Sequence, residues 1–272
     1  MRNIFTILCV ISLLAYGCGS SGSKESSSES TEAESSDIKE IVEREFEYPI
    51  PTAYQVTSLL QDAGAGFVLG ITNSPDNVDK YETQKDRALN LGIYGADLSY
   101  ASTYNRQEET MSFLNASKKL VDDLQMSGIF TTEMVSRVET NIANKDSLIL
   151  IVTESFYDTY ESLNQNGQNK LSLLVVAGSW IEGLYITSQL AISSNYDERI
   201  MDIVAKQKIP ANQLFELLQQ HSGDEDVSSV LPLVNYLKET YASIDENAPL
   251  SQEQLDDIYK NVETTRSAIV GD

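Results

Sequence analysis

The chain has 272 residues and is strongly acidic: 41 Asp and Glu residues outnumber 19 Lys and Arg residues, for a formal net charge of −22. Such a charge repels phosphate backbones, so we expect no nucleic-acid partner. The two cysteines, Cys9 and Cys18, both precede residue 19, and His221 is the only histidine. After residue 18 the composition therefore excludes disulfides, cysteine nucleophiles and cysteine- or histidine-based zinc sites, and we expect neither a metal nor a cofactor.

The first 18 residues have the pattern of a signal peptide. Arg2 gives a positive start, and residues 4–15 form an apolar run that is shorter than the ~20 residues a helix needs to span a bilayer. The run ends in Leu14-Ala15-Tyr16-Gly17-Cys18, which resembles the lipobox of bacterial lipoprotein precursors. The resemblance implies cleavage before Cys18 by signal peptidase II and a lipid anchor, including an acyl group such as palmitate, on that cysteine. The alternatives are an ordinary secretory signal with an incidental cysteine, or an uncleaved anchor.

A Ser- and Glu-rich segment follows Cys18. Residues 19–36 contain no large apolar side chain, so they cannot bury enough surface to offset the entropy of ordering them. The sequence thus divides into a lipoprotein signal peptide at residues 1–17, a lipidated, disordered tether at residues 18–47, and a helical domain at residues 48–272. Because Gly19 rather than Asp follows the cysteine, the sorting rule of enterobacterial lipoproteins favours the outer membrane of a Gram-negative cell envelope.

From residue 52 onward, apolar side chains recur at spacings of three and four, which is typical of amphipathic helices. Thr52 and Ser74-Pro75 are expected to start helices. The expected helices cover residues 53–63, 76–104, 107–125, 132–142, 146–163, 170–192, 196–207, 211–220, 226–244 and 252–269. The fold class is all-α, a compact multi-helix bundle of roughly nine helices, with a short α-solenoid of helical hairpins as the alternative.

Two of these helices are expected to lie at the centre. In one helix a small residue recurs every four positions, at Ala88, Gly92 and Ala96. The other helix has a similar row with the same spacing, at Ser179, Gly183 and Thr187. Small residues on one face allow two helices to approach closely. The apolar run of the second helix, residues 171–186, contains Glu182 and is short and polar for a membrane span.

Each central helix carries a carboxylate within an apolar stretch: Asp97 in the first and Glu182 in the second. If the helices pack together, the pair could act as acid and base or bind a cation. In the alternative interpretation both carboxylates have structural roles. Glu182 would be partly solvated, and Asp97 would accept a hydrogen bond from a tyrosine hydroxyl. The helix face that carries Asp97 also carries other aromatic and polar side chains, a combination that suits a sugar- or peptide-binding site. In the alternative interpretation, the tyrosines of this face belong to the core. The candidate binding residues are Arg87, Asn90, Tyr94, Asp97, Tyr100, Tyr104 and Glu182.

The segments Leu91-Gly92-Ile93-Tyr94-Gly95-Ala96-Asp97 and Ala177-Gly178-Ser179-Trp180-Ile181-Glu182-Gly183 make the domain similar to uncharacterised helical lipoproteins of Gram-negative bacteria. This resemblance implies architecture and no activity. We expect a lipid-anchored envelope protein that is a non-catalytic binding or scaffold module. Its partners would be the membrane, through the lipid on Cys18, and an envelope protein or small ligand. The alternatives are an envelope enzyme that uses Asp97 and Glu182 as an acid/base pair, and a purely structural envelope component.

Overall fold

The computed structural model describes residues 50–126, 131–165, 167–245 and 248–271. These residues form ten α-helices and one short 3-10 helix, and they contain no β-strand. The all-α prediction is therefore confirmed, and the helix number agrees with the expected one. The predicted signal peptide, Cys18 and the tether lie outside the described residues.

The helices follow the predicted order with small differences at their ends. They are α2 (Ala53–Asp62), η1 (Pro75–Lys80, the 3-10 helix), α3 (Gln84–Thr103), α4 (Gln107–Asp123), α5 (Thr132–Asn141), α6 (Lys145–Gln165), α7 (Asn169–Ser193), α8 (Glu198–Ala205), α9 (Lys208–Gln220), α10 (Glu225–Thr240) and α11 (Gln252–Val270).

Side-chain caps explain where several helices begin. Thr52 caps α2 as predicted, and Gln55 bonds back to the Thr52 N–H to complete a capping box. Gly64 follows the helix with a φ of 85°, a conformation that glycine adopts without steric cost. Ser251 and Gln254 form a second capping box at the start of α11. These local interactions satisfy backbone donors that a helix start leaves without partners.

The prediction of one helix over residues 76–104 is wrong at its start. Ser74 does cap a helix, but that helix is η1, which ends at Lys80. Tyr81 is extended (φ −87°, ψ 101°), and Thr83 then caps α3 by accepting a hydrogen bond from the Asp86 N–H. The break places the Tyr81 side chain in the core, where its ring lies 6.3 Å from that of Tyr94. A tertiary contact therefore overrides the helical spacing.

Two residues show where local pattern and structure differ. Leu59 shares helical spacing with the buried Val56 and Leu60 but is itself 53% exposed. Pro232 lies inside α10, which begins at Glu225, is capped by Asp224 and continues past the proline.

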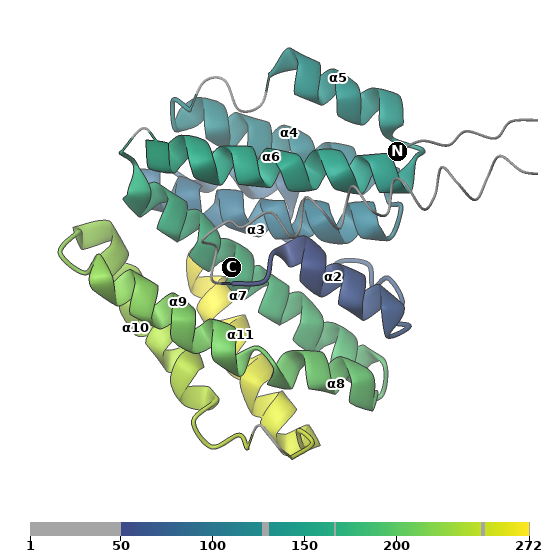
Figure 1. Cartoon of the computed structure of the whole chain (residues 1–272), viewed down its shortest axis with the longest axis vertical. Coiled ribbons are helices and arrows are strands. Elements are labelled where there is room, and N and C mark those ends of the chain that lie inside the picture. The colour runs from purple at the N-terminus through teal and green to yellow at the C-terminus, as the bar shows by residue number, and fades with distance from the viewer. Residues whose placement is uncertain (1–49, 127–130, 166, 246–247, 272) are drawn as a thin grey trace, which may run out of the picture.

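Helix α7 is the centre of the fold. In Figure 1, α3 to α6 lie on one side of it and α8 to α11 on the other, with α7 passing between the two groups. It contacts members of both groups as well as α2, and its side chains from Leu171 to Ser188 are all buried. A helix surrounded in this way belongs to a compact bundle rather than to a solenoid, in which each repeat touches only its neighbours.

The closest approach in the core is between α3 and α7, as the small residues predicted. A Cβ atom on Gly92 would collide with the main-chain carbonyl of Val175, and one on Gly178 would collide with that of Leu89. Gly183 was expected to share this role, but a Cβ there would meet nothing within 4 Å. The contact on α7 is thus made by Gly178, which lies on a different face from the predicted row.

Helix α7 is also long and apolar enough to cross a membrane, and it is the one described helix with this property. At 25 residues it exceeds the apolar run seen in the sequence, so its length does not argue against a span. Its most apolar window is, however, entirely buried by the other helices. The helix has the properties of a core helix and indicates nothing about cellular location.

Candidate functional site

Three charged side chains meet in the core: Asp97 from α3, Glu182 from α7 and Arg266 from α11. Asp97 and Glu182 have no exposed surface, and Arg266 is 6% exposed. Arg266 Nε donates to Glu182 Oε2 at 2.6 Å, and its Nη2 donates to Oε1 at 3.0 Å. This two-pronged geometry is the strongest form of an Arg–carboxylate bond. Both oxygens of Glu182 are therefore engaged by one guanidinium group.

Asp97 is held less completely. Its Oδ2 accepts a hydrogen bond from the Asn73 N–H at 3.1 Å, while its Oδ1 is buried without a donor among the described residues. Burial, followed by the nearby Glu182 carboxylate, raises the pKa of Asp97 well above its usual value, although Arg266 opposes the shift. The two carboxyl groups of Asp97 and Glu182 are neighbours in the core. A hydrogen bond between them requires that one of the two carries a proton, because two carboxylates have none to share.

Arg266 supplies the positive charge of the cluster. Burial acts to lower its pKa, but Glu182 and, more weakly, Asp97 raise it, and the net pKa lies above the usual arginine value. The guanidinium carbon also lies 4.5 Å from the ring centroid of Tyr185, a cation–π contact. Arg266 is thus charged at every accessible pH.

The two carboxylates could be identified from the sequence, but their counter-ion was not. The structure brings Asp97 and Glu182 together, which was the condition for any joint role. Arg266 was missed, although a signal was present: it interrupts the apolar stripe of α11. The members of that stripe, at spacings of three and four, are Leu255, Ile258, Val262, Arg266 and Ile269. A charged residue in such a stripe requires a buried partner.

A network of amides surrounds the Asp97 side of the cluster. Asn73 Nδ2 donates to Tyr81 Oη at 2.9 Å, and Asn73 Oδ1 accepts from Asn77 at 2.8 Å. Asn90, a candidate binding residue, is fully buried and donates to the carbonyls of Asp86 and Ile269. These bonds join the segment before η1 to α3 and α11. The amides are therefore occupied within the chain.

The candidate tyrosines of α3 bind the chain's own backbone. The hydroxyls of Tyr94 and Tyr104 each donate at 2.8 Å, to the carbonyls of Ser74 and Ala65 respectively. Tyr100 accepts a 2.7 Å hydrogen bond from the Val68 N–H, and burial raises its pKa to about 12. The three rings hold the irregular segment at residues 65–74 against α3. This face of α3 is covered by the chain itself.

Of the seven candidate binding residues, only Arg87 and Tyr104 retain partial exposure; the other five are buried. Arg87 Nε donates to the Tyr81 carbonyl at 3.1 Å and lies 4.0 Å from an Asp123 carboxylate oxygen. Most of the set gathers in one polar region at the junction of α3 with the preceding segment, where its side chains bond to other parts of the chain.

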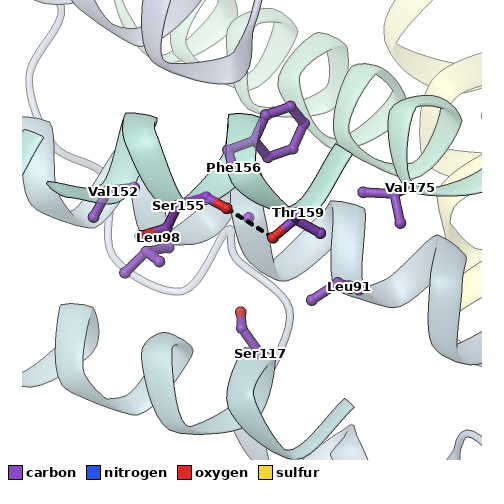
Figure 2. Close-up of a pocket in the computed structure, with 9 residues that line it drawn as sticks. Leu91, Leu98, Ser117, Val152, Ser155, Phe156, Thr159 and Val175 are labelled. Carbon is purple, nitrogen blue, oxygen red and sulfur yellow. Dashed lines mark hydrogen bonds between the residues drawn. The ribbon is translucent and has the colours of Figure 1, made fainter. Parts of the chain in front are cut away.

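A small cavity lies between α3, α4, α6 and α7 (Figure 2). Its volume is about 30 Å³, and Ser117 Oγ, which faces it, has no hydrogen-bond partner among the described residues. On the opposite side Thr159 Oγ1 donates to the Ser155 carbonyl at 2.7 Å. This volume suits a water molecule, which needs at least ~10–15 Å³, and is far too small for an organic ligand.

A larger concave surface lies between α8, the start of α9 and residues 248–250. Its volume is about 530 Å³, within the range typical of ligand or peptide sites. The lining is mixed: Met201, Ala205, Ile209, Pro249 and Leu250 are apolar, and Glu198, Asp202, Lys206 and Lys208 are charged. We call this surface the α8–α9 groove. No motif in the sequence predicts this groove, because its walls come from segments whose proximity no local pattern reveals.

Metal binding finds no support in the described residues, which contain no group of three potential His, Cys, Asp or Glu ligands. His221 is exposed at the C-cap of α9. Comparison with known protein families, curated proteins and solved structures yields no match to this chain. Function must therefore be inferred from the residues themselves.

Proposed function

We propose that this chain is a lipid-anchored protein of the Gram-negative cell envelope, held in the outer membrane through Cys18, and that it serves as a non-catalytic binding or scaffold module. One structural observation supports the non-catalytic part. The side chains best suited to acid/base chemistry, Asp97 and Glu182, are fully buried, and both oxygens of Glu182 are bound by Arg266. A catalytic acid or base must reach its substrate within hydrogen-bond distance.

The α8–α9 groove is the best candidate for the partner-binding face. It is open to solvent, it is much larger than the 30 Å³ cavity, and Ile209 on its wall is 56% exposed. An apolar surface with charges at its edges resembles the composition of protein interfaces, where apolar anchors are surrounded by polar side chains. We infer that an envelope protein or small ligand binds here.

The enzyme alternative retains one supporting observation, the proximity of the two carboxyls in the core. It requires an opening of the helix bundle that would bring substrate to Asp97. The enzyme alternative would be favoured if the protein turned over a substrate and if Asp97→Asn and Glu182→Gln each abolished that turnover while leaving the fold intact.

The anchor is tested by Cys18→Ser. We expect this variant to leave the membrane fraction and to escape cleavage by signal peptidase II. Mass spectrometry of the wild-type protein should find an acylated N-terminal cysteine at residue 18. A mature N-terminus elsewhere, without lipid, would refute the anchor.

The groove is tested by site-specific photo-crosslinking in intact cells. A photoreactive residue at Ile209 should capture one discrete envelope component. The matched control is Tyr236 on α10, which is 48% exposed but outside the groove, and which should capture none. Equal labelling from both positions, or none from Ile209, would show that the groove is not the binding face.

A further inference from the structure

The charged cluster in the core contains two carboxyl groups and one guanidinium group. Arg266 uses Nε and Nη2 on the two oxygens of Glu182, so the pair is neutral as a unit. Asp97 lies beside this neutral pair and has no exposed surface, and its Oδ1 has no donor in the part of the chain that the structure describes. A negative charge on Asp97 would therefore be a net charge in the core, which is far more costly than a neutral carboxyl group.

We propose that Asp97 carries a proton at neutral pH and donates it in a hydrogen bond to Glu182, and that this shared proton makes the junction of α3, α7 and α11 a pH-sensitive element of the fold. When the proton leaves, two buried carboxylates face one arginine. Their repulsion weakens the contact through which α11, carrying Arg266, is held against α3 and α7. The inference concerns the fold itself and does not depend on the proposed binding function.

The groups around Asp97 favour the protonated form from each neighbouring element. Glu182 on α7 repels a second negative charge, and Tyr94 on α3 adds another acidic group nearby. Among the described residues, the Asn73 N–H, from the segment before η1, donates to Asp97, and Arg266 on α11 is the nearby cation. Both favour ionisation, but burial, the largest influence, and Glu182 outweigh them and raise the pKa of Asp97.

The sign of the pH dependence follows from this direction. In the unfolded chain Asp97 loses its proton near its ordinary pKa of about 3.9, while in the folded chain it keeps the proton to a higher pH. Between those two pKa values the folded state binds one more proton than the unfolded state. The contribution of Asp97 to stability is therefore complete below about pH 4 and falls as pH rises. Above that pH the unfolding constant increases about tenfold per pH unit, until the pH passes the pKa of Asp97 in the folded state.

The first test observes the proton in the wild-type protein. Carbon-13 NMR of selectively labelled aspartate carboxyls should show one signal that keeps the shift of a protonated acid at pH 7. Asp97→Asn should remove that signal. A wild-type spectrum in which every aspartate carboxyl is ionised at pH 7 would overturn the proposal, and this result needs no variant to fold.

The second test measures denaturant unfolding against pH for wild type and Asp97→Asn. The amide keeps an acceptor for the Asn73 N–H and supplies a donor toward Glu182, so the variant should fold. The ratio of the wild-type unfolding constant to that of the variant should rise about tenfold per pH unit from about pH 4 upward and then level off. Asp62→Asn, at an exposed position on α2, is the matched control and should show a flat ratio. A flat ratio for Asp97→Asn would overturn the proposal.

Discussion

Helices α3 and α7 make two different contacts within little more than one helical turn of each other. At Gly92 and Gly178 the two backbones are so close that neither position has room for a Cβ atom. Five residues further along α3 and four along α7, the gap is instead occupied by Asp97 and Glu182 with Arg266 from α11. The first contact is decided by side-chain volume and the second by charge.

The difference shows why residue type alone is an incomplete guide to role. Gly183 and Gly178 look alike in the sequence, yet only Gly178 meets a neighbouring backbone. Asp97 and Glu182 both look like candidate site residues, yet Glu182 is bound to arginine and Asp97 lacks a full set of donors.

The largest effect is expected at the glycine contact. Gly92→Leu would force the α3 and α7 backbones apart, and we expect a loss of about 4 kcal/mol or more, beyond the usual cost of overpacking. The measurement is the free energy of unfolding in denaturant, with far-UV circular dichroism to detect loss of the fold. Stability close to that of the wild type would mean that α3 and α7 do not meet at Gly92.

Removing the positive charge of Arg266 should lower the free energy of unfolding by nearly as much. Arg266→Met keeps an apolar side chain against Tyr185 but leaves Glu182 buried without its partner, and breaking such a pair typically costs about 3–5 kcal/mol. The double variant Arg266→Met/Glu182→Gln should recover a large part of this loss, because it removes the unpaired charge. Simple addition of the two single effects would contradict a direct interaction between these residues.

The tyrosines of α3 should each contribute modestly. Tyr104→Phe removes the hydrogen bond to the Ala65 carbonyl while keeping the ring, and we expect a loss of about 1 kcal/mol. Tyr236→Phe, at a more exposed hydroxyl, is the control and should cost less. If Tyr104→Phe abolished partner binding without changing stability, this face would be a site after all.

The smallest effect, of opposite sign, is expected at Gly183. A Cβ there meets no atom within 4 Å, and alanine favours a helix over glycine by about 1 kcal/mol. Gly183→Ala should therefore leave thermal stability unchanged or slightly raise it. A clear drop in melting temperature would place an unrecognised contact beside Gly183.

Much of the fold could be predicted because helix starts and apolar spacings are local. Thr52 and the stripes of the later helices were sufficient to place most elements. The break at Tyr81 could not be predicted in this way, because its cause is the contact of Tyr81 with the Tyr94 ring, 13 residues further along the chain, and with Asn73, which lies before the expected helix. Local pattern and tertiary contact conflict at that point, and the tertiary contact determines the structure.

The candidate site could be predicted only in part. An acidic residue in an apolar stretch identified Asp97 and Glu182, since burying a carboxylate always requires a partner. The partner is 84 residues from Glu182 along the chain, and no spacing rule connects the two. The α8–α9 groove was missed for the same reason, because it is formed by the packing of α8 and α9 against residues 248–250.

We propose that the buried carboxylates hold the fold together and do not form a reaction site. The decisive measurement is the free energy of unfolding of Glu182→Gln at neutral pH. The account predicts a loss of about 1–3 kcal/mol, less than for Arg266→Met because Asp97 can ionise and partly replace the lost charge. Functional sites commonly hold polar groups at the expense of stability. A Glu182→Gln variant as stable as the wild type, or more stable, would therefore contradict the account.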